Sequence, residues 1–353
     1  MKCSSDEIDF TYFAASYMTL KGVIRILKLK YLFHNEELAS MLLGYWKFDQ
    51  LSLELFKYYR ISSNAIYPFQ DQDQTRLLRF APRSGKFREN VMAELEFLRY
   101  LRSCGYSVPE SIPARDSEEL VIATTPWGEY YASVFKRVAG VQLSSTSLGN
   151  EIVYGYGQAL GQLHRLSSEY VPGNHRRWSH LDVLHWIEDI LVGFPNEKAA
   201  KTEARLLRDF FATIPATKAN YGLIHYDFEY DNVFYDEATR SCHVIDFDDA
   251  MYHWYALDIA NALDSLQDLI DPQAYADKKQ LFMEGYAAEY PLADEHADIM
   301  PACRRFASLY GYARTLHSTA EQWLHEPEWM VHLRARLAES MRKKSGPFGI
   351  KIS

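Results

Sequence analysis

The spacing of apolar residues changes along the chain and divides it into three parts. From residue 6 to about residue 59, apolar residues recur every three or four positions, which predicts helix. From 64 to about 143, short runs typical of strands alternate with polar turns. Beyond Gly140 the helical spacing returns and continues to the end of the sequence, apart from one strand-like region near residue 240. The pattern therefore predicts an α+β protein with a small sheet-containing lobe followed by a larger, mostly helical lobe.

The middle part contains the predicted sheet. Its expected elements are a helix at 90–102 and strands at 65–69, 76–80, 120–124 and 130–136. We predict three domains: a helical N-terminal extension packed on the small lobe at 1–60, the small lobe at 61–138 and the helical lobe at 139–353. A cleft between two such lobes is the usual place for a ligand.

Three glycines, Gly155, Gly157 and Gly161, loosely resemble a dinucleotide-binding loop. Their spacing differs from that motif, and no predicted strand precedes them. Leu160 and Leu163 recur at helical spacing among them, so we expect a packed helix over 150–168 instead.

Composition narrows the class of protein. The 353 residues are 48% hydrophobic and 24% charged, which is typical of a globular protein. With 38 basic and 47 acidic residues the net charge is -9, which argues against nucleic-acid binding. The 4 cysteines lie far apart in the sequence and form neither a zinc motif nor a disulfide framework.

Two stretches bear on location. The first residues include Asp6, Glu7 and Asp9, where a secretory signal would be basic. The most membrane-like stretch, 18–33, contains several lysines and an arginine and is shorter than the ~20 apolar residues that a span needs. We therefore expect a cytoplasmic protein without a membrane span, in which the lysines of 18–33 extend into water.

Negative charge is concentrated between residues 221 and 300, where Asp and Glu greatly outnumber Lys and Arg. Such a region can hold a divalent cation, attract a cationic substrate or form a solvated face. The spacing of the acidic residues has to decide among these three.

The most informative segment is a predicted hairpin with strands at 232–235 and 242–246 and a turn at 237–241. Asn232 and Asp246 are equally far from the centre of this turn, so we expect them to lie opposite each other, ~4.5–5.5 Å apart at Cα. An amide oxygen and a carboxylate side by side suit Mg²⁺. Asp227 lies in the loop entering the hairpin, where its carboxylate could sit beside the metal and accept a proton from a substrate hydroxyl.

This arrangement is what phosphoryl transfer requires. The reaction needs in-line positioning, a metal that neutralises phosphate charge and a carboxylate that orients the nucleophile. Acyl transfer fits less well, because the chain contains no G-x-S-x-G motif.

Three motifs follow one another along this region: His225-x-Asp227-x-x-x-x-Asn232, then Ile245-Asp246-Phe247-Asp248, then Trp254-Tyr255-x-x-Asp258-Ile259-Ala260. Together they resemble the signature of the aminoglycoside phosphotransferase/choline kinase family, and weaker matches extend over about 64–262. That family has the bilobal protein-kinase-like fold. The resemblance implies an enzyme that transfers the γ-phosphate of ATP or GTP to a hydroxyl group of a small molecule.

The resemblance also implies a role for individual residues of the helical lobe. Asp227 corresponds to the catalytic base, and Asn232 and Asp246 correspond to the metal ligands. His225 and Asp258 correspond to residues that brace the catalytic loop.

In the small lobe, Arg79 corresponds to the basic residue of the third strand, and Glu94 corresponds to its helical ion-pair partner. Phe135, Arg137 and Val138 fall in the segment that would bind the adenine through its backbone.

Two residues depart from the family pattern, and three more are candidates for substrate contact. Tyr226 stands where the family usually has glycine, and its bulk is expected to narrow the site or reshape substrate access. Arg79 stands where many relatives have lysine, and because arginine can hold phosphate oxygens in a bidentate manner, the geometry is expected to differ. The candidates for substrate contact are Asp248, Asp249 and Glu229.

These residues support a Mg²⁺-dependent kinase of a small hydroxylated acceptor, and the acidic region favours a cationic acceptor. Aminoglycosides, other antibiotics, choline-like alcohols, homoserine and sugars are the acceptors that the resemblance suggests. The alternative is a catalytically silent kinase-like binding or scaffold protein, because a fold alone does not settle function. A protein kinase fits less well, since Asp246 and Asp258 are too close in sequence for a peptide-binding loop between them. The sequence leaves the oligomeric state, the acceptor and the choice of nucleotide open.

Overall fold

The computed structural model describes residues 28–292 and 296–352. Packing divides the chain into two compact units. The first comprises the residues up to Lys86 together with Ser111–Arg137, and the second comprises Phe87–Glu110 and Val138–Ser353. The predicted helical stretch from residue 6 and the basic stretch 18–33 both begin outside the described residues.

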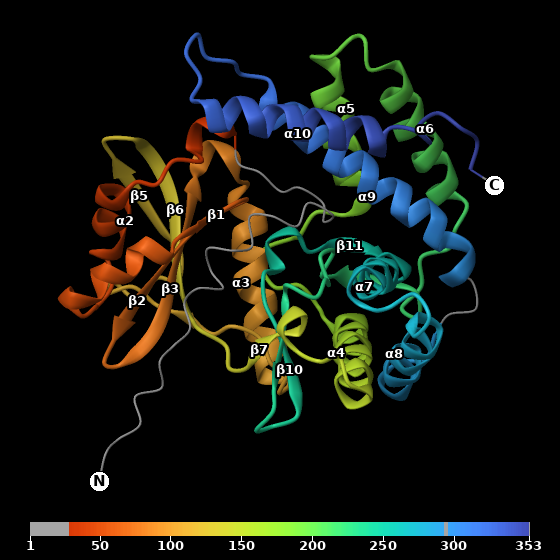
Figure 1. The fold of residues 1–353 in the computed structure, drawn as a ribbon, viewed down its shortest axis with the longest axis horizontal. Helices are drawn as coiled ribbons and strands as arrows, with labels where there is room; N and C mark the ends of the chain where they lie inside the picture. The colour runs from red at the N-terminus through yellow and green to blue at the C-terminus, as the bar shows by residue number, and fades with distance from the viewer. Residues whose placement is uncertain (1–27, 293–295, 353) are drawn as a thin grey trace. The chain divides into compact units, whose positions relative to one another are not determined.

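An antiparallel sheet forms the centre of the first unit. Its strand order is β1-β2-β3-β6-β4, and β5 also pairs with β6 (Figure 1). All four strands predicted for this region are present, and the short β1 and β4 are additional. The strands are β1 (Arg60–Ile61), β2 (Ala65–Asp71), β3 (Gln74–Pro82), β4 (Ser111–Ile112), β5 (Val121–Thr125) and β6 (Gly128–Lys136).

A tight turn joins β2 to β3. Asp71 pairs with Gln74, and the two residues between them, Gln72 and Asp73, have left-handed φ values of 52° and 60°. Two consecutive left-handed residues match the twist of the flanking strands, which is why such turns favour residues like Asp. The first two long strands are therefore joined without a glycine-rich loop.

Helical segments before the sheet share its core. They are η2 (Leu29–Tyr31), α2 (Glu36–Leu43) and η3 (Gln50–Tyr58), and η4 (Arg83–Gly85) follows β3. Asn35 begins α2 by accepting the Leu38 amide hydrogen at 2.9 Å. The apolar face of α2, with Leu38 and Leu42, packs into the cluster that contains Tyr67 and Phe80 of the sheet. Burial of this face holds the N-terminal segments on the sheet.

The helix α3 (Arg88–Ser103) matches the prediction for 90–102 but groups with the second unit, whereas the sequence analysis placed it in the small lobe. Its apolar face explains this difference. The ring of Phe97 lies 4.9 Å from that of Tyr170 and 5.9 Å from that of Phe247, and Tyr100 donates to the Leu166 carbonyl at 2.9 Å.

The second unit is mostly helical. Its elements are α4 (Asn150–Glu169), α5 (His180–Val192), α6 (Lys198–Ala212), α7 (Ala256–Leu269), α8 (Tyr275–Glu289), α9 (His296–Thr319) and α10 (Glu328–Lys344), with the short η5 (Leu143–Ser145) and η6 (Phe247–Asp249). No helix within 28–292 or 296–352 is long and apolar enough to cross a membrane.

The glycines that resemble a dinucleotide loop lie in α4, as predicted, and two of them, Gly157 and Gly161, allow it to pack closely on α8 (Figure 1). A Cβ atom added to Gly157 would lie 1.9 Å from the Phe282 carbonyl oxygen, and one added to Gly161 would lie 2.4 Å from that of Tyr286. Both distances are impossible for real atoms. These glycines therefore serve helix packing.

Two small sheets complete the second unit. One has the order β10-β9-β7, with β7 (Val141–Gln142), β9 (Val233–Asp236) and β10 (Ser241–Val244), and the other pairs β8 (Tyr221–Ile224) with β11 (Met251–Trp254). The β9–β10 hairpin was predicted. The pair β8–β11 was not, because each strand has only 4 residues and is largely buried.

A buried ion pair fixes the residues that follow α10. The Glu203 carboxylate on α6 is fully buried and accepts from the Arg305 guanidinium of α9 at 2.7 and 2.5 Å. The same carboxylate accepts the Gly349 amide hydrogen at 2.9 Å, and Arg305 also donates to the Ile350 carbonyl at 2.6 Å. Glu203 thus joins α6, α9 and the C-terminal segment.

We predict that Glu203→Ala lowers the free energy of unfolding by ~3 kcal/mol, because it leaves the Arg305 charge buried without its partner. Denaturant unfolding monitored by circular dichroism measures this change. Glu339→Ala is the matched control, since Glu339 pairs with Arg342 on the exposed surface of α10 and its loss should leave stability unchanged. Equal stability of both variants would contradict the role given to Glu203.

A cluster of aromatic rings around two buried histidines lies in the core of the second unit. His180 at the start of α5 contacts the ring of Trp254 at 4.7 Å, and its Nδ1 lies 3.0 Å from the Tyr221 hydroxyl. His253 on β11 lies 4.6 Å from the ring of Phe306. Burial lowers the pKa of His180 to about 4 and holds the pKa of His253 well below its ordinary value. Both histidines are therefore neutral at pH 7.

This burial makes stability depend on pH in a defined direction. The unfolded chain binds a proton at His180 below pH ~6.5 and the folded protein does not until about pH 4, so acid favours the unfolded state in this window. We expect His180 to account for a loss of ~2 kcal/mol in unfolding free energy between pH 7 and pH ~5. Urea unfolding of the wild type and His180→Gln at both pH values tests this. A pH dependence as steep in the variant as in the wild type would contradict the assignment.

Candidate functional site

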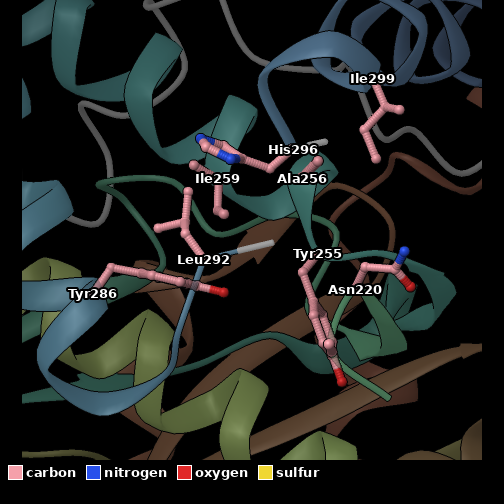
Figure 2. A pocket seen from close by; sticks show the side chains of 9 residues that line it. Asn220, Tyr255, Ala256, Ile259, Tyr286, Leu292, His296 and Ile299 are labelled. Carbon is pink, nitrogen blue, oxygen red and sulfur yellow. The ribbon is translucent and has the colours of Figure 1, made fainter. Parts of the chain in front are cut away.

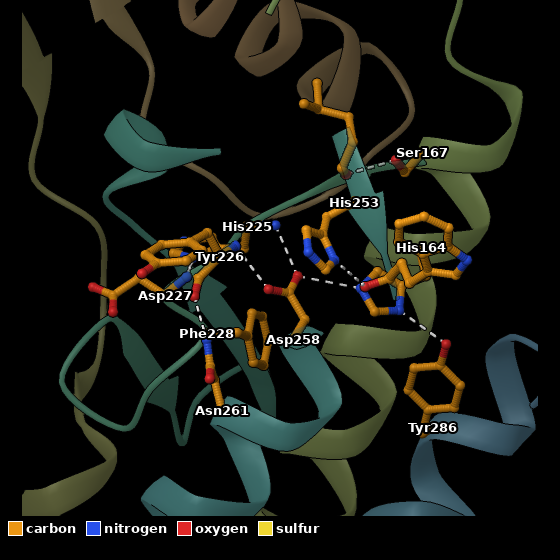
Figure 3. A network of polar contacts seen from close by, with 12 residues as sticks. His164, Ser167, His225, Tyr226, Asp227, Phe228, His253, Asp258, Asn261 and Tyr286 are labelled. Carbon is orange, nitrogen blue, oxygen red and sulfur yellow. Dashed lines mark hydrogen bonds and ion pairs between the residues drawn. The ribbon is translucent and has the colours of Figure 1, made fainter. Parts of the chain in front are cut away.

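The predicted catalytic residues lie in the loop 225–232, between β8 and β9. The buried carboxylate of Asp258, in the first turn of α7, accepts the backbone amide hydrogens of His225 and Tyr226, each at 2.7 Å. These two bonds fix the direction in which the loop leaves β8. Figure 3 shows the loop, Asp258 and the side chains that contact it.

The helix α7 supports the loop at three points on one face. Besides Asp258, Asn261 donates through its Nδ2 to the Tyr226 carbonyl at 2.5 Å, and Ser265 Oγ accepts the Tyr230 amide hydrogen at 2.8 Å. Positions 258, 261 and 265 are neighbours on a helix surface because they are separated by three and four residues. Sequence reasoning identified only Asp258, although Asn261 and Ser265 continue from it at helical spacing and were a detectable signal.

A buried histidine extends the network. His164 of α4 has its Nε2 3.2 Å from Asp258 Oδ2 and its Nδ1 2.9 Å from the Tyr286 hydroxyl (Figure 3). Burial lowers the pKa of His164, so the ring is neutral at pH 7. A neutral ring that donates a hydrogen bond from Nε2–H to the carboxylate can accept one on Nδ1 from the Tyr286 hydroxyl. Sequence analysis did not identify His164.

His225 connects the loop to the segment that carries Asp246. Its Nδ1 lies 3.1 Å from the Asp227 amide nitrogen and its Nε2 lies 2.8 Å from the Ile245 carbonyl oxygen. The first contact needs an acceptor and the second needs a donor, so one neutral tautomer with the proton on Nε2 satisfies both. The buried ring thereby holds the two segments at a fixed separation.

Asp227 and Asn232 contact each other directly. Asn232 Nδ2 donates to Asp227 Oδ2 at 2.6 Å and to the Asp227 carbonyl at 3.0 Å. The side-chain nitrogen of Asn232 thus bonds to Asp227, and the side-chain oxygen Oδ1 of Asn232 is the atom suited to a cation. Carboxylate and amide oxygens are the donors that a hard divalent cation prefers.

The predicted register of the hairpin was wrong by one residue. Val233 pairs with Val244, and the Ile245 amide donates to the Asn232 carbonyl at 2.9 Å, so Asn232 lies opposite Ile245 and not opposite Asp246. The loop between β9 and β10 is one residue shorter than predicted, and Arg240 closes it with a left-handed φ of 51°.

Asp246 follows the hairpin in a turn. Its own φ of 65° and ψ of 61° are left-handed, which ends the extended path of β10 and begins η6. A non-glycine residue in this conformation is uncommon and requires support from its surroundings. The position of the carboxylate is therefore set by this turn and not by strand pairing.

The candidates for substrate contact are not equivalent. The Asp249 carboxylate is engaged by Arg314 of α9 at 2.5 Å, with both side chains largely buried. Asp248 is buried in η6, and Glu229 is half-buried in the catalytic loop. Of these three residues, Asp249 thus forms an ion pair within the protein.

Tyr226 is fully buried and has a left-handed φ of 73°. Its ring meets that of Tyr310 on α9 edge to face at 5.5 Å between centroids. The tyrosine therefore packs α9 against the loop 225–232, and its bulk is taken up by this contact.

The remaining predicted residues divide between the two units. In the first unit, Arg79 on β3 places its guanidinium 4.7 Å from the centre of the Phe135 ring on β6, and the Arg137 amide bonds to the Thr75 carbonyl at 3.3 Å. Glu94, buried on α3, and Val138, half-buried, belong to the second unit.

The acidic side chains and one small cavity of the second unit bear on which ligands it can hold. No group of three or more His, Cys, Asp or Glu side chains in the described part of the chain could hold a metal ion. A cation at Asn232 and Asp246 would complete its coordination with phosphate oxygens and water. A cavity of about 10 Å³ lined by Asn220, Tyr255 and Tyr286 admits about one water molecule, which excludes a nucleotide (Figure 2).

Known proteins resemble this chain over most of its length. The sequence model described as "Phosphotransferase enzyme family" matches residues 61–292. Amicoumacin kinase of Bacillus subtilis (strain 168) is 23% identical over 271 residues, which cover 74% of this chain and 76% of that protein.

Solved structures show the same fold. An amicoumacin kinase in complex with AMP-PNP, Ca²⁺ and Ami has a TM-score of 0.71 and 17% identity, and the match covers 90% of this chain and 96% of that one. A microcompartment-associated aminopropanol kinase has a TM-score of 0.61 and 19% identity, with 90% and 100% covered.

These matches confirm the protein-kinase-like α+β fold and the family suggested by the three sequence motifs. The matched region includes the loop 225–232, Asp246 and Asp258. This chain belongs to the phosphotransferase enzyme family and is a small-molecule kinase.

Proposed function

We propose that the enzyme transfers the γ-phosphoryl group of ATP or GTP to a hydroxyl of a small, cationic acceptor, with Asp227 as the base and Asn232 and Asp246 as ligands of Mg²⁺. The observation that carries this proposal is the 2.6 Å bond between Asn232 Nδ2 and Asp227 Oδ2. It places the candidate base and a candidate metal ligand in direct contact in one loop.

Each residue then has a chemical task. Asp227 accepts the proton of the acceptor hydroxyl, and the bond from Asn232 fixes which carboxylate oxygen is engaged. Asn232 and Asp246 would hold Mg²⁺, which would supply positive charge to the transferring phosphate. His225 and Asp258 hold the loop so that these groups do not have to reorganise during the reaction.

We assign the nucleotide contacts to the residues that the family resemblance suggests. Phe135, Arg137 and Val138 bind the base, and Arg79 with Glu94 positions the phosphates. In support of this, the Arg79 guanidinium lies over the Phe135 ring, 4.7 Å from its centre. Arginine at this position holds phosphate oxygens through two nitrogens, where lysine would present a single charge.

The acceptor class follows from charge. Acidic residues predominate between 221 and 300, but several have partners: Asp258 bonds the catalytic loop, Asp249 pairs with Arg314, and Asp264 pairs with Arg304. The region remains net negative after these pairs are removed, which favours a cationic acceptor by electrostatic steering. An aminopropanol kinase among the structural neighbours has an acceptor that carries an amine, in line with this proposal.

We predict that Asp227→Asn lowers kcat by ~10²–10⁴ and leaves nucleotide affinity unchanged, because an amide cannot accept the proton. The Asn232 bond survives, since an amide oxygen still accepts it. Asp246→Asn should instead weaken nucleotide binding in the presence of Mg²⁺. Coupled measurement of ADP release and calorimetric titration with nucleotide separate the two effects. Glu237→Gln, in the exposed hairpin turn, is the control, and wild-type turnover by Asp227→Asn would disprove the mechanism.

We further predict that amine-bearing acceptors stimulate nucleotide hydrolysis or transfer more than neutral ones. The panel contains amicoumacin, aminoglycosides, macrolides, aminopropanol, choline, homoserine and simple sugars, each with ATP and with GTP. For a cationic acceptor kcat/KM should fall as salt is added, since screening weakens steering. A neutral sugar as the best acceptor, with no salt dependence, would contradict the cationic class. No stimulation by any compound, together with no nucleotide binding, would favour a silent binding protein.

A further inference from the structure

A buried arginine outside the predicted site holds the turn that carries Asp246. Arg177 lies between α4 and α5 and is only 3% exposed. Its Nε donates to the Ala250 carbonyl, and its Nη2 donates to the carbonyls of Asp248 and, at 3.1 Å, Phe247. Three bonds thus reach the backbone carbonyls of the four residues that follow Asp246.

The turn needs this support. Asp246 is left-handed, and η6 has only 3 residues, so its last carbonyls have few partners within the element. A buried carbonyl without a donor costs about 1–3 kcal/mol. Arg177 supplies donors to three of these carbonyls from one rigid guanidinium group.

The fourth bond of Arg177 reaches a different element. Its Nη1 donates to the carbonyl of Asn90, in the first turn of α3. The neighbouring Trp178 amide donates to Asn90 Oδ1 at 3.3 Å, and the Trp178 carbonyl accepts from the Tyr252 amide of β11 at 2.8 Å. Residues 177 and 178 therefore connect α3 to the turn that follows Asp246 and to β11 beyond it.

No acidic side chain in the described part of the chain pairs with Arg177, so its charge is compensated by carbonyl dipoles alone. A lysine has one nitrogen and cannot make four divergent bonds of this kind. The arrangement depends on the planar fork of arginine and not only on its charge.

We propose that Arg177 is a positioning residue for the metal ligand Asp246. It holds the turn of Asp246 against the first turn of α3 and thereby sets the affinity for the divalent metal in the nucleotide complex. This inference rests on the proposed function, in which Asp246 is a metal ligand. Arg177 itself contacts neither nucleotide nor metal in this scheme.

The test measures nucleotide binding as a function of Mg²⁺ concentration in Arg177→Lys, Arg177→Ala and the control Arg176→Ala. Arg176 is the adjacent, exposed arginine that pairs with Asp182. We expect the half-saturating Mg²⁺ concentration to rise about tenfold or more in both Arg177 variants, as residues that orient metal ligands usually show. The control should match the wild type. Guanidinium ion added at millimolar concentration should lower the half-saturating Mg²⁺ concentration of Arg177→Ala toward the wild-type value. It should not do so for Asp246→Asn.

The outcomes separate this proposal from the one on which it rests. The proposal for Arg177 would be overturned if folded Arg177 variants showed the wild-type dependence of nucleotide binding on Mg²⁺. A lower melting temperature with this dependence unchanged would also overturn it, because it would indicate a purely structural role. If Arg177→Ala fails to fold, Arg177→Lys decides. If Asp246→Asn retains full Mg²⁺ dependence, the assignment of Asp246 fails and the proposal for Arg177 fails with it.

Discussion

The site depends on one buried carboxylate, that of Asp258. Removal of such a charge from water costs several kcal/mol unless it is fully hydrogen-bonded, and here two backbone amides and His164 provide the bonds. Because an ionised carboxylate only accepts, it fixes the direction of both amides. His225 then transmits this order to Ile245, and Arg177 holds the turn beyond it. Asp227, Asn232 and the turn of Asp246 are thus parts of one hydrogen-bonded framework.

Sequence reasoning was strong where a pattern is local. Alternating runs located the strands of the first unit, helical spacing identified the glycines of α4 as packing residues, and the motifs from His225 to Asp258 indicated the family. In each case the decisive information lies in one continuous stretch of sequence. The roles of the individual site residues remain predictions.

Other features depended on contacts that no local pattern records. The hairpin register differed by one residue because Arg240 adopts a left-handed conformation that a spacing argument does not contain. His164 and Arg177 bond to segments about 70 to 120 residues away, and Arg177 bonds only to the main chain, which has the same chemistry at every position. Tyr226 departs from the family pattern in sequence, but its effect is understood only through its contact with Tyr310.

The bonds of Arg177 to the main chain have a consequence for how this enzyme could diversify. Every residue type carries a backbone carbonyl, so a substitution of Asp248 would change a side chain that we propose to contact the acceptor, while the carbonyl that Arg177 engages would persist. Selection for a new acceptor could therefore act on this position with little effect on the turn that carries the proposed metal ligand Asp246. Holding a turn by its carbonyls separates the evolution of specificity from the preservation of catalysis.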